Sequence, residues 1–444
     1  MIEGLRPYPD MKPTGLAWLP EVPAHWDVRR NGRLFGIRKE TRYPDLPILE
    51  VSLRTGVRVR DLENGPRKQQ MTDRSKYQRA AKGDLAYNMM RMWQGAVGVV
   101  PTDGLVSPAY VVVRPREDTF APYFANLFRT AAYMREVETY SRGIVPDRNR
   151  LYWESFKQIT CCVPPAEEQQ LIVQFLDWHG AQTAKLIRAK KKLITLLNEQ
   201  RQLIIRRAVT GGFDAAVARK PSGTDWLGQV PEHWQVKRLK WATRLQRGYD
   251  LPAERRVSGP YPVVSSGGVI DHHAETRSRG PGVVMGRYGS TNAVFYIEKD
   301  FWPHNTSLFV TNFHNNYRLW CYYLLCTISK ADHSGKSAVP GVDRKDLFDI
   351  IVPVPPYEEQ IAIVRGIERL SQELNETISR FEHEVALVQE LRMRLIADVV
   401  TGKLDVRAAA ASLPETTEVE TVEDLDEDDL EESVGEVDTE EAAV

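Results

Sequence analysis

The sequence predicts an α+β protein with two tandem globular domains, separated and followed by long helices that pair as an antiparallel coiled coil. Three observations lead to this prediction: motifs that occur twice, a helical block repeated at constant length, and short apolar runs typical of strands between the repeats. A repeat period far above about 20–50 residues indicates a duplicated domain with its connector, rather than a short-repeat solenoid. We therefore expect a pseudo-twofold internal repeat.

Two motifs define the repeat. The pattern Trp-Leu-x-x-Val-Pro-x-His-Trp-x-Val begins at Trp18 and returns at Trp226. The pattern Pro-Pro-x-Glu-Glu-Gln begins at Pro164 and returns at Pro355. The offsets between copies are 208 and 191 residues, so the segments between the motifs differ in length by 17 residues. The block that follows the second motif, up to a Thr-Gly pair, aligns without insertion or deletion, which indicates that length is constrained there.

This block of constant length is expected to form a long helix in each half. The double proline and the acidic turn favour a helix start, and the Thr-Gly pair ends the block. In the second copy apolar residues recur every seven positions, as in a coiled-coil seam. They are Ile367, Leu374, Phe381, Val388 and Leu395, with Ile363, Leu370, Ile378, Val385 and Leu391 between them. The first copy is less regular and has Leu176, Leu197 and Ile204 at equivalent sites, with Ile187 and Ile194 between. About 45 residues at roughly 1.5 Å each give a rod on the order of 65–70 Å.

Equal lengths and matching seams favour antiparallel pairing of the two helices over two separate surface helices. Their polar faces differ in charge, since the first carries Lys185, Arg188, Lys190, Lys191, Lys192 and Arg201 and the second Glu373, Glu376, Glu382 and Glu390. Facing each other, these residues would form ion pairs; facing outward, they could bind partner proteins. A solvated face is the third interpretation.

The segments between the motifs have the pattern of mixed α and β structure. Short β-branched or apolar runs, broken by Gly, Pro and Asp, predict strands in both halves. They lie at 85–88, 96–100 and 109–113 in the first half, and at 283–285, 293–297 and 307–310 in the second. Helical stretches are expected to follow at 122–138 and 316–330. The predicted parts are a first domain over 1–163, a helix over 164–212, a second domain over 213–354, a helix over 355–407 and an acidic disordered tail over 408–444.

The net charge of −1 conceals an uneven distribution. The last 32 residues contain fifteen Asp and Glu and no Lys or Arg, so residues 1–412 carry 59 basic against 45 acidic side chains, a net charge of +14. A basic body of this kind is expected for a protein that binds a polyanion, although a solvated basic surface is an alternative. The acidic tail either improves solubility or screens unwanted nucleic-acid contacts, and the sequence does not distinguish these roles.

Other features narrow the class of protein. No apolar run reaches about 18 residues and the first residues lack a signal-peptide core, so we expect a cytoplasmic protein with no membrane contact. The cysteines at 161, 162, 321 and 326 form no CxxC pair and have no histidine at ligand spacing. They are expected to be small buried residues rather than metal ligands or disulfides.

The order of variable domain, long helix, variable domain, long helix resembles the DNA specificity subunit of Type I restriction-modification systems. The resemblance rests on the two repeated motifs and on Val-Pro turns at Val145 and Val339, and it covers residues 12–407. It implies that each variable domain is a target recognition domain for one half of a bipartite site in double-stranded DNA. It also implies that the helices separate the domains and bind two methyltransferase subunits, with restriction and translocase subunits joining the complex.

Catalytic motifs are missing from the sequence. The tripeptide Pro355-Pro356-Tyr357 is similar to the catalytic motif of amino-methyltransferases, but Val354 stands where that motif has Asn or Asp. No Gly-x-x-x-x-Gly-Lys-Ser/Thr loop is present for ATP. No histidine spacing suggests a metal site. We therefore expect a non-catalytic chain with no cofactor of its own, and the resemblance implies that S-adenosylmethionine, ATP and Mg²⁺ belong to the partner subunits.

Candidate DNA-binding residues were chosen by side-chain chemistry. Arg suits guanine, Asn and Gln suit adenine, and Lys and Arg suit phosphates. In the first domain the candidates are Arg54, Arg58, Arg60, Arg74, Asn88, Arg91, Gln94 and Arg148. In the second they are Tyr249, Arg255, Arg287, Tyr288, Asn292, Asn305, Lys336 and Arg344. Arg91 and Arg287 carry most weight as DNA-binding candidates, because we expect them at equivalent places in the two domains. We expect the tryptophans of the repeated motif to anchor each domain to a helix end instead; they are Trp18, Trp26, Trp226 and Trp234.

Two other functions remain open at this point. One is the recognition subunit of a related system in which a single partner both methylates and cleaves DNA, which the number of companion genes would distinguish. The other is a coiled-coil scaffold without a DNA role, which a lack of salt-dependent DNA binding by the assembled complex would favour.

Overall fold

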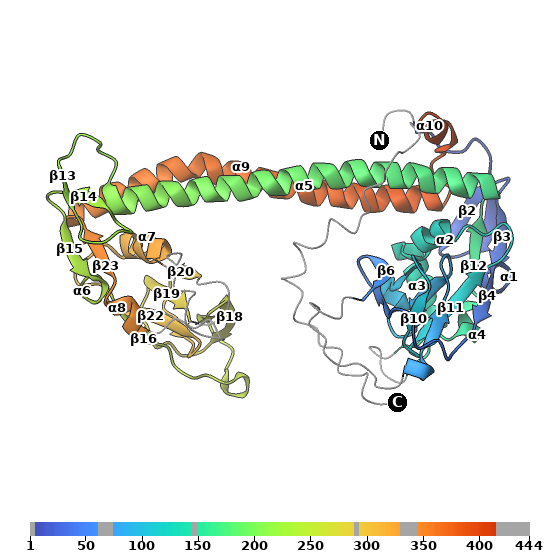
Figure 1. Cartoon of the computed structure of the whole chain (residues 1–444), viewed down its shortest axis with the longest axis horizontal. Helices are drawn as coiled ribbons and strands as arrows, with labels where there is room; N and C mark the ends of the chain where they lie inside the picture. Colours follow the sequence, from blue (N-terminus) through green and yellow to red (C-terminus); the bar gives the residue numbers. More distant parts are fainter. Residues whose placement is uncertain (1–4, 61–73, 144–148, 288–292, 329–343, 414–444) are drawn as a thin grey trace. The chain divides into compact units, whose positions relative to one another are not determined.

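The computed structural model (Figure 1) describes residues 5–60, 74–143, 149–287, 293–328 and 344–413. The chain divides into two compact units, which we call unit 1 (Met1–Lys190 and His383–Val444) and unit 2 (Lys191–Glu382). Both boundaries fall inside long helices, so each unit contains a part of both helices.

The two long helices are α5 (Ala166–Gly211, 46 residues) and α9 (Tyr357–Val400, 44 residues). Each carries two glutamates in its first turn, where a negative charge is favoured by the helix dipole. Each is followed by a glycine in the left-handed region, Gly212 at φ 70° and Gly402 at φ 75°. The predicted pair of helices of nearly equal length is thus present in the structure.

The helices run antiparallel within each unit. In unit 1, Phe175 and Leu176 of α5 share a core with Val399 and Val400 of α9, and Lys190 forms an ion pair with Glu384. In unit 2, Nη1 of Arg201 donates to Oδ1 of Asn375 at 2.8 Å, and Ile205 of α5 shares a core with Ile363 and Ile367 of α9. Residue numbers therefore rise along one helix as they fall along the other.

The predicted seam is only partly buried. Ile363, Ile367, Ile378 and Val385 are buried, whereas Leu370 and Leu391 are 44% and 62% exposed. A seam between two helices is one stripe wide, so apolar residues beside that stripe stay in contact with solvent. The expectation that Leu370 and Leu391 fill the seam was wrong.

The remaining elements of unit 1 form its globular part and its C-terminal segment. In chain order they are β1 (Met11–Leu16), β2 (Leu19–Pro23), β3 (Asp27–Arg30), α1 (Asn31–Leu34), β4 (Phe35–Arg38), β5 (Leu49–Ser52), β6 (Gly56–Val59), η1 (Arg74–Lys76), β7 (Gln78–Ala80), β8 (Leu85–Asn88), η2 (Met92–Gln94), β9 (Val97–Val99), β10 (Gly104–Val106), β11 (Tyr110–Pro115), α2 (Ala121–Phe128), α3 (Ala131–Tyr140), α4 (Trp153–Phe156), β12 (Thr160–Val163) and α10 (Arg407–Ala411).

Unit 2 contains a corresponding series. It comprises β13 (Arg219–Pro221), β14 (Gln229–Pro231), β15 (Gln235–Arg238), α6 (Leu239–Ala242), β16 (Arg244–Arg247), η4 (Ala253–Arg255), β17 (Tyr261–Ser265), β18 (Gly268–His273), β19 (Gly282–Gly286), β20 (Val294–Ile297), β21 (Trp302–Pro303), β22 (Ser307–Asn312), α7 (Arg318–Ile328), α8 (Arg344–Phe348) and β23 (Ile351–Val354).

The central sheet has the same topology in both units. Its order is β4-β11-β8-β9 in unit 1 and β16-β22-β19-β20 in unit 2, and all neighbours are antiparallel. The smaller pairs β12-β3 and β15-β23 also correspond. The six predicted strand segments all contain strands of these central sheets, so the internal duplication inferred from two short motifs extends to the central sheet of each unit.

The units differ where their lengths differ. Unit 1 adds the pairs β5-β6 and β10-β7, whereas unit 2 adds the three-stranded sheet β18-β17-β21.

The helical stretch expected over 122–138 is split into α2 and α3, because Thr130 caps α3 by accepting a hydrogen bond from the amide of Tyr133 at 3.3 Å.

The cysteines behave as expected at three of four positions. Cys161, Cys162 and Cys321 are buried and Cys326 is half-buried. Burial raises the pKa of Cys162 to about 12, which keeps this thiol protonated. These residues contribute to packing rather than to chemistry.

Candidate nucleic-acid interface

In unit 1 the repeated His-Trp motif binds the second glutamate of the acidic turn. Oε1 of Glu168 accepts hydrogen bonds from Trp26 Nε1 at 2.9 Å and from the hydroxyl of Tyr8 at 2.6 Å. Its Oε2 lies 2.7 Å from Nε2 of His25. The Glu168 side chain is only 5% exposed, so these bonds supply the partners that a buried carboxylate requires.

Unit 2 repeats this arrangement with Glu359. Trp234 Nε1 donates to Oε1 at 3.0 Å, and His233 Nε2 lies 2.7 Å from Oε2. The Glu359 side chain is 32% exposed. The first glutamate therefore has a third partner, Tyr8, and less contact with water than the second.

The glutamine that follows each glutamate joins the start of the long helix to the globular part. Gln169 Oε1 accepts from the amide of Phe120 at 2.8 Å, just before α2. Gln360 Oε1 accepts from the amide of Tyr317 at 2.7 Å, just before α7. Their Nε2 groups donate to the carbonyls of Pro164 and Pro355 at 2.8 and 2.9 Å. The repeated motifs therefore fix each globular part to the start of its long helix.

The expected anchoring role fits two of the four repeated tryptophans. Trp26 and Trp234 bind the glutamates at the helix starts, as predicted. Trp18 instead packs edge-on against Tyr133, with ring centroids 5.4 Å apart. Trp226 donates Nε1 to the carbonyl of Ile351 at 3.1 Å. These two indole rings contact the globular part itself, although the carbonyl of Trp226 also accepts a hydrogen bond of 3.5 Å from Nη2 of Arg206 on α5.

In unit 1 several candidates gather around the turn after β8. Asn88 is buried, and its Oδ1 accepts from the amide of Met90 at 2.9 Å, so this side chain shapes the turn. Arg91 precedes η2, and Gln94 in η2 is exposed. Arg129 connects this turn to the loop that holds Arg54, because its guanidinium donates to the carbonyls of Leu53 and Arg54. A Cβ added at Gly95 would lie 3.9 Å from the Cα of Arg129.

The other candidates of unit 1 do not join this group in the described residues. Arg58 on β6 binds Glu50 through Nε at 2.7 Å, so its charge is partly neutralised. Arg60 and Arg74 lie on either side of residues 61–73, which are not described. Arg148 also lies outside the described residues.

In unit 2 the structure brings Tyr249, Arg287 and Asn305 to one end of the sheet. The amide of Tyr249 donates to the carbonyl of Pro303 at 2.8 Å, and Arg247 Nε donates to the carbonyl of Asn305 at 3.1 Å. The amide of Arg287 donates to Oγ of Ser266 at 3.1 Å. We call Arg247, Tyr249, Ser266, Arg287, His304 and Asn305 the sheet-end cluster.

The backbone of this cluster is closely packed. A Cβ at Gly248 would lie 2.1 Å from the carbonyl oxygen of His304, so only glycine fits there. His304 donates its amide to the carbonyl of Val264 at 2.8 Å. Burial and the nearby Arg256 lower the pKa of His304, while Asp250 opposes this effect, so the imidazole is neutral at pH 7.

The remaining candidates of unit 2 lie elsewhere. Arg255 is exposed on η4. Arg344 begins α8, but its side chain is outside the described part, as are Tyr288, Asn292 and Lys336.

The expected equivalence of Arg91 and Arg287 was wrong. The amide of Arg287 donates to the carbonyl of Thr306 at 3.2 Å, and the amide of Met89 makes the corresponding bond to Ala109 at 3.1 Å. The strand register is consistent with this correspondence, since Ala86 pairs with Val112 as Val284 pairs with Phe309. Arg287 therefore corresponds to Met89, which lies two residues before Arg91.

Three residues at these surfaces were not among the sequence candidates. Asp250 accepts a hydrogen bond from Asn305 Nδ2 at 2.5 Å. Arg277 lies over the rings of Trp302 and Tyr249, at 5.0 and 5.9 Å from their centroids, and Arg129 has the contacts given above. Composition alone offered no signal for them, because each matters through a contact with a residue distant in sequence.

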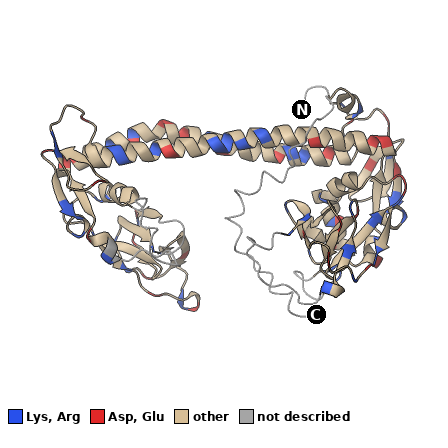
Figure 2. Cartoon of the chain, in the orientation of Figure 1, with Lys and Arg blue, Asp and Glu red and all other residues tan. Residues whose placement is uncertain are grey.

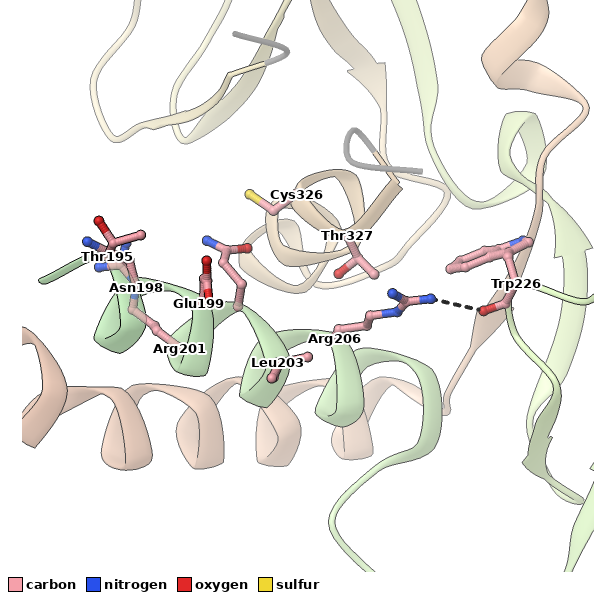
Figure 3. Close-up of a pocket in the computed structure, with 10 residues that line it drawn as sticks. Thr195, Asn198, Glu199, Arg201, Leu203, Arg206, Trp226, Cys326 and Thr327 are labelled. Carbon is pink, nitrogen blue, oxygen red and sulfur yellow. Dashed lines mark hydrogen bonds between the residues drawn. The ribbon is translucent and has the colours of Figure 1, made fainter. Parts of the chain in front are cut away.

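A pocket of about 750 Å³ lies in unit 2 between α5 and α7 (Figure 3). Its lining residues are Thr195, Asn198, Glu199, Arg201, Gln202, Leu203, Arg206, Trp226, Cys326 and Thr327. Leu193, Leu196 and Leu203 on the same helix are 45%, 49% and 66% exposed. This surface belongs to the helix and to the repeated motif, not to the sheet-end cluster.

Charge on the long helices is also uneven. Figure 2 shows Lys and Arg gathered along the middle of α5. Lys190 forms an ion pair with Glu384, a glutamate of α9 that was not among the residues expected on its charged face. Glu390, in contrast, pairs with Arg394 of its own helix.

Within the described ranges, no group of three or more His, Cys, Asp or Glu side chains is placed to hold a metal ion. Among the helices described, none combines the length and apolar character needed to cross a membrane.

Comparisons with known proteins agree with this architecture. Residues 231–380 match the family model described as Type I restriction modification DNA specificity domain. The specificity subunit of the Type I restriction enzyme EcoKI from Escherichia coli K12 is 22% identical over 335 residues, which cover 66% of this chain and 68% of the relative. The putative MjaX specificity subunit from Methanocaldococcus jannaschii is 22% identical over 321 residues, covering 67% and 71%.

A solved structure has the same fold. That structure is described as showing the structural basis of complex assembly and conformational transition of the type I R-M system. The TM-score is 0.62 at 14% identity, and the match covers 85% of this chain and 98% of the other.

Proposed function

We propose that this chain, a member of the Type I restriction-modification DNA specificity family, recognises a bipartite DNA site with one half-site bound by each unit. The chain is the non-catalytic specificity subunit, and it acts by selecting the sequence at which its partners work. S-adenosylmethionine, ATP and Mg²⁺ would be bound by those partners.

One observation carries this proposal: the same sheet occurs twice on the same helix anchor, with different side chains at its end. Glu168 and Glu359 make matching bonds to the His-Trp motif. In contrast, matching backbone bonds place Arg287 at the position of Met89, and the matching turns before β22 and β11 place Asn305 at the position of Pro108. Recognition of two different half-site sequences requires the same scaffold in both units and different side chains at the end of the sheet.

The helices are proposed to set the distance between half-sites. Support comes from the similar lengths of α5 and α9, and from antiparallel packing in each unit. Adding one turn of about four residues to one helix should change the unread spacer and leave both half-sites unchanged. An unchanged spacer would disprove the role of the helices in spacing.

Two methyltransferase subunits are proposed to bind the helices, and restriction subunits to join through them. An internally duplicated chain offers two similar surfaces, as two copies of one partner require. Exposed leucines support this assignment, since Leu196 and its repeat counterpart Leu387 are 49% and 43% exposed. Exposed apolar residues of this kind are common at protein interfaces.

The experiment is selection from randomised duplex DNA by the chain assembled with its methyltransferase subunits. We expect two conserved blocks separated by unselected bases, with an affinity that falls as salt rises. Binding without sequence preference, or no binding at low salt, would refute the proposal and favour a scaffold.

A further inference from the structure

We propose that Asn305 recognises an adenine in the half-site of unit 2, and that Asp250 is the positioning residue for its amide. This inference rests on the proposed function and names the base and the residues that act at the sheet-end cluster.

The backbone around Asn305 is held on both sides. The amide of His304 donates to the carbonyl of Val264 at 2.8 Å, and the amide of Ser307 donates to the carbonyl of His304 at 3.0 Å. The carbonyl of Asn305 itself accepts from Arg247 Nε at 3.1 Å. A residue fixed in this way loses little conformational entropy when it contacts DNA.

Asp250 determines which way the Asn305 amide points. An ionised carboxylate has only acceptor atoms, so the side-chain NH₂ group must face it. The observed bond, Nδ2 to Oδ1 of Asp250 at 2.5 Å, agrees with this orientation. The carbonyl Oδ1 and the second N–H of the amide remain available, and no described residue donates a hydrogen bond to Oδ1. The side chain is half-buried, so it remains partly accessible to solvent.

A donor and an acceptor side by side match adenine. In the major groove adenine presents the N6 amino group beside the N7 acceptor, and an oriented asparagine amide bonds to both. Guanine presents two acceptors there, and cytosine or thymine would make one bond only. The geometry thus favours adenine over the other three bases.

The unit 1 position lacks this chemistry. The bond from Ser307 to His304 corresponds to the bond from the amide of Tyr110 to the carbonyl of Ser107 at 2.9 Å, so Asn305 corresponds to Pro108. Proline has no side-chain donor or acceptor. A determinant present in one unit only is expected if the two half-sites differ in sequence.

The test uses the chain assembled with its methyltransferase subunits and duplexes that contain the selected site. Each adenine of the unit 2 half-site is replaced in turn by 7-deazaadenine, which lacks the N7 acceptor. For the native chain we expect one replacement to weaken binding roughly tenfold. Asn305→Ala should weaken binding to the normal site by a similar factor and remove the effect of that replacement.

Variants of Asp250 separate positioning from folding. Asp250→Ala should lower the preference for that one adenine, while Asp250→Asn, which keeps an acceptor, should restore it. The matched control is Asn312→Ala, an exposed asparagine at the other end of β22, which should leave the preference unchanged. Unchanged recognition of the unit 1 half-site by the same complexes would show that each variant is folded.

The outcomes are distinguishable. If the native complex selects no sequence, the proposed function fails. If selection is normal but Asn305→Ala keeps its adenine preference, or loses preference for a different base, the present inference is overturned and the proposed function stands. If Asp250→Ala keeps the full preference, Asp250 has no positioning role.

Discussion

The indole Nε1 of Trp26 donates a hydrogen bond of 2.9 Å to the carboxylate of Glu168, 142 residues further along the chain. This bond connects the first repeated motif to the second, and Trp234 with Glu359 repeats it in unit 2. In each unit the two repeated motifs therefore contact each other and hold the globular part against the start of the long helix.

Loss of the glutamate that accepts these hydrogen bonds should destabilise the two units unequally. Glu168→Ala leaves the buried Trp26 N–H and Tyr8 hydroxyl without their acceptor, so we expect a loss of about 3 kcal/mol in the free energy of unfolding of unit 1. Glu359→Ala should cost about 1 kcal/mol, because water can reach the more exposed site. Urea unfolding followed by hydrogen exchange of each unit measures both. Equal losses would contradict the role given to burial.

Gly402 should tolerate no side chain. Its φ is 75°, and an added Cβ would lie 2.3 Å from Cδ of Pro23. Gly402→Ala should therefore destabilise unit 1 by more than about 3 kcal/mol, since a steric clash adds to backbone strain. Gly15, with φ 74° and no atom within 4 Å of an added Cβ, is the matched control. Gly15→Ala should cost only about 1–2 kcal/mol in the same thermal unfolding measurement.

Arg91 should affect one half-site only. Arg91→Ala is expected to relax base preference at the half-site of unit 1, at a cost of about 1–3 kcal/mol if the contact is bidentate. Selection from randomised DNA measures this change, with the exposed Arg135→Ala on α3 as control. A uniform loss across all sequences with a smaller salt slope would assign Arg91 to a phosphate instead.

An ion-pair network makes the stability of unit 1 depend on pH. Arg38 and Arg79 lower the pKa of Glu40, and Arg79 lowers the pKa of Asp103. A depressed folded-state pKa stabilises the fold above the unfolded value and loses this effect as pH falls, here below about 4.5. Thermal unfolding between pH 6 and pH 3 should therefore show a smaller pH dependence for Glu40→Gln than for the native chain. An unchanged pH dependence would show that the network contributes nothing measurable.

Much of the fold followed from the sequence because periodic patterns report local structure. The seven-residue repeat and the capping residues predicted α5 and α9, and β-branched runs predicted the central strands. Leu370 and Leu391 could not be placed correctly, because burial depends on how narrow the helix contact is. The equivalence of Arg91 and Arg287 failed because Arg91 lies in the turn after β8, whereas Arg287 directly follows β19 and makes the backbone bond that Met89 makes in unit 1.

The candidate site was less predictable. Residue chemistry selected Tyr249, Arg287 and Asn305, which the fold brings to one end of the sheet. It also selected Arg58, whose charge Glu50 partly neutralises. Asp250 and Arg129 were missed because their roles depend on tertiary contacts that no local pattern encodes.

The central claim is that each unit reads its own half-site independently of the other. The most direct measurement replaces residues 27–163, which lie between the two anchoring motifs of unit 1, with a second copy of residues 235–354. Selection from randomised DNA by the assembled complex should then yield the unit 2 half-site twice, in twofold-related orientation. A folded chain that selects the original site, or a site without this duplication, would contradict the claim.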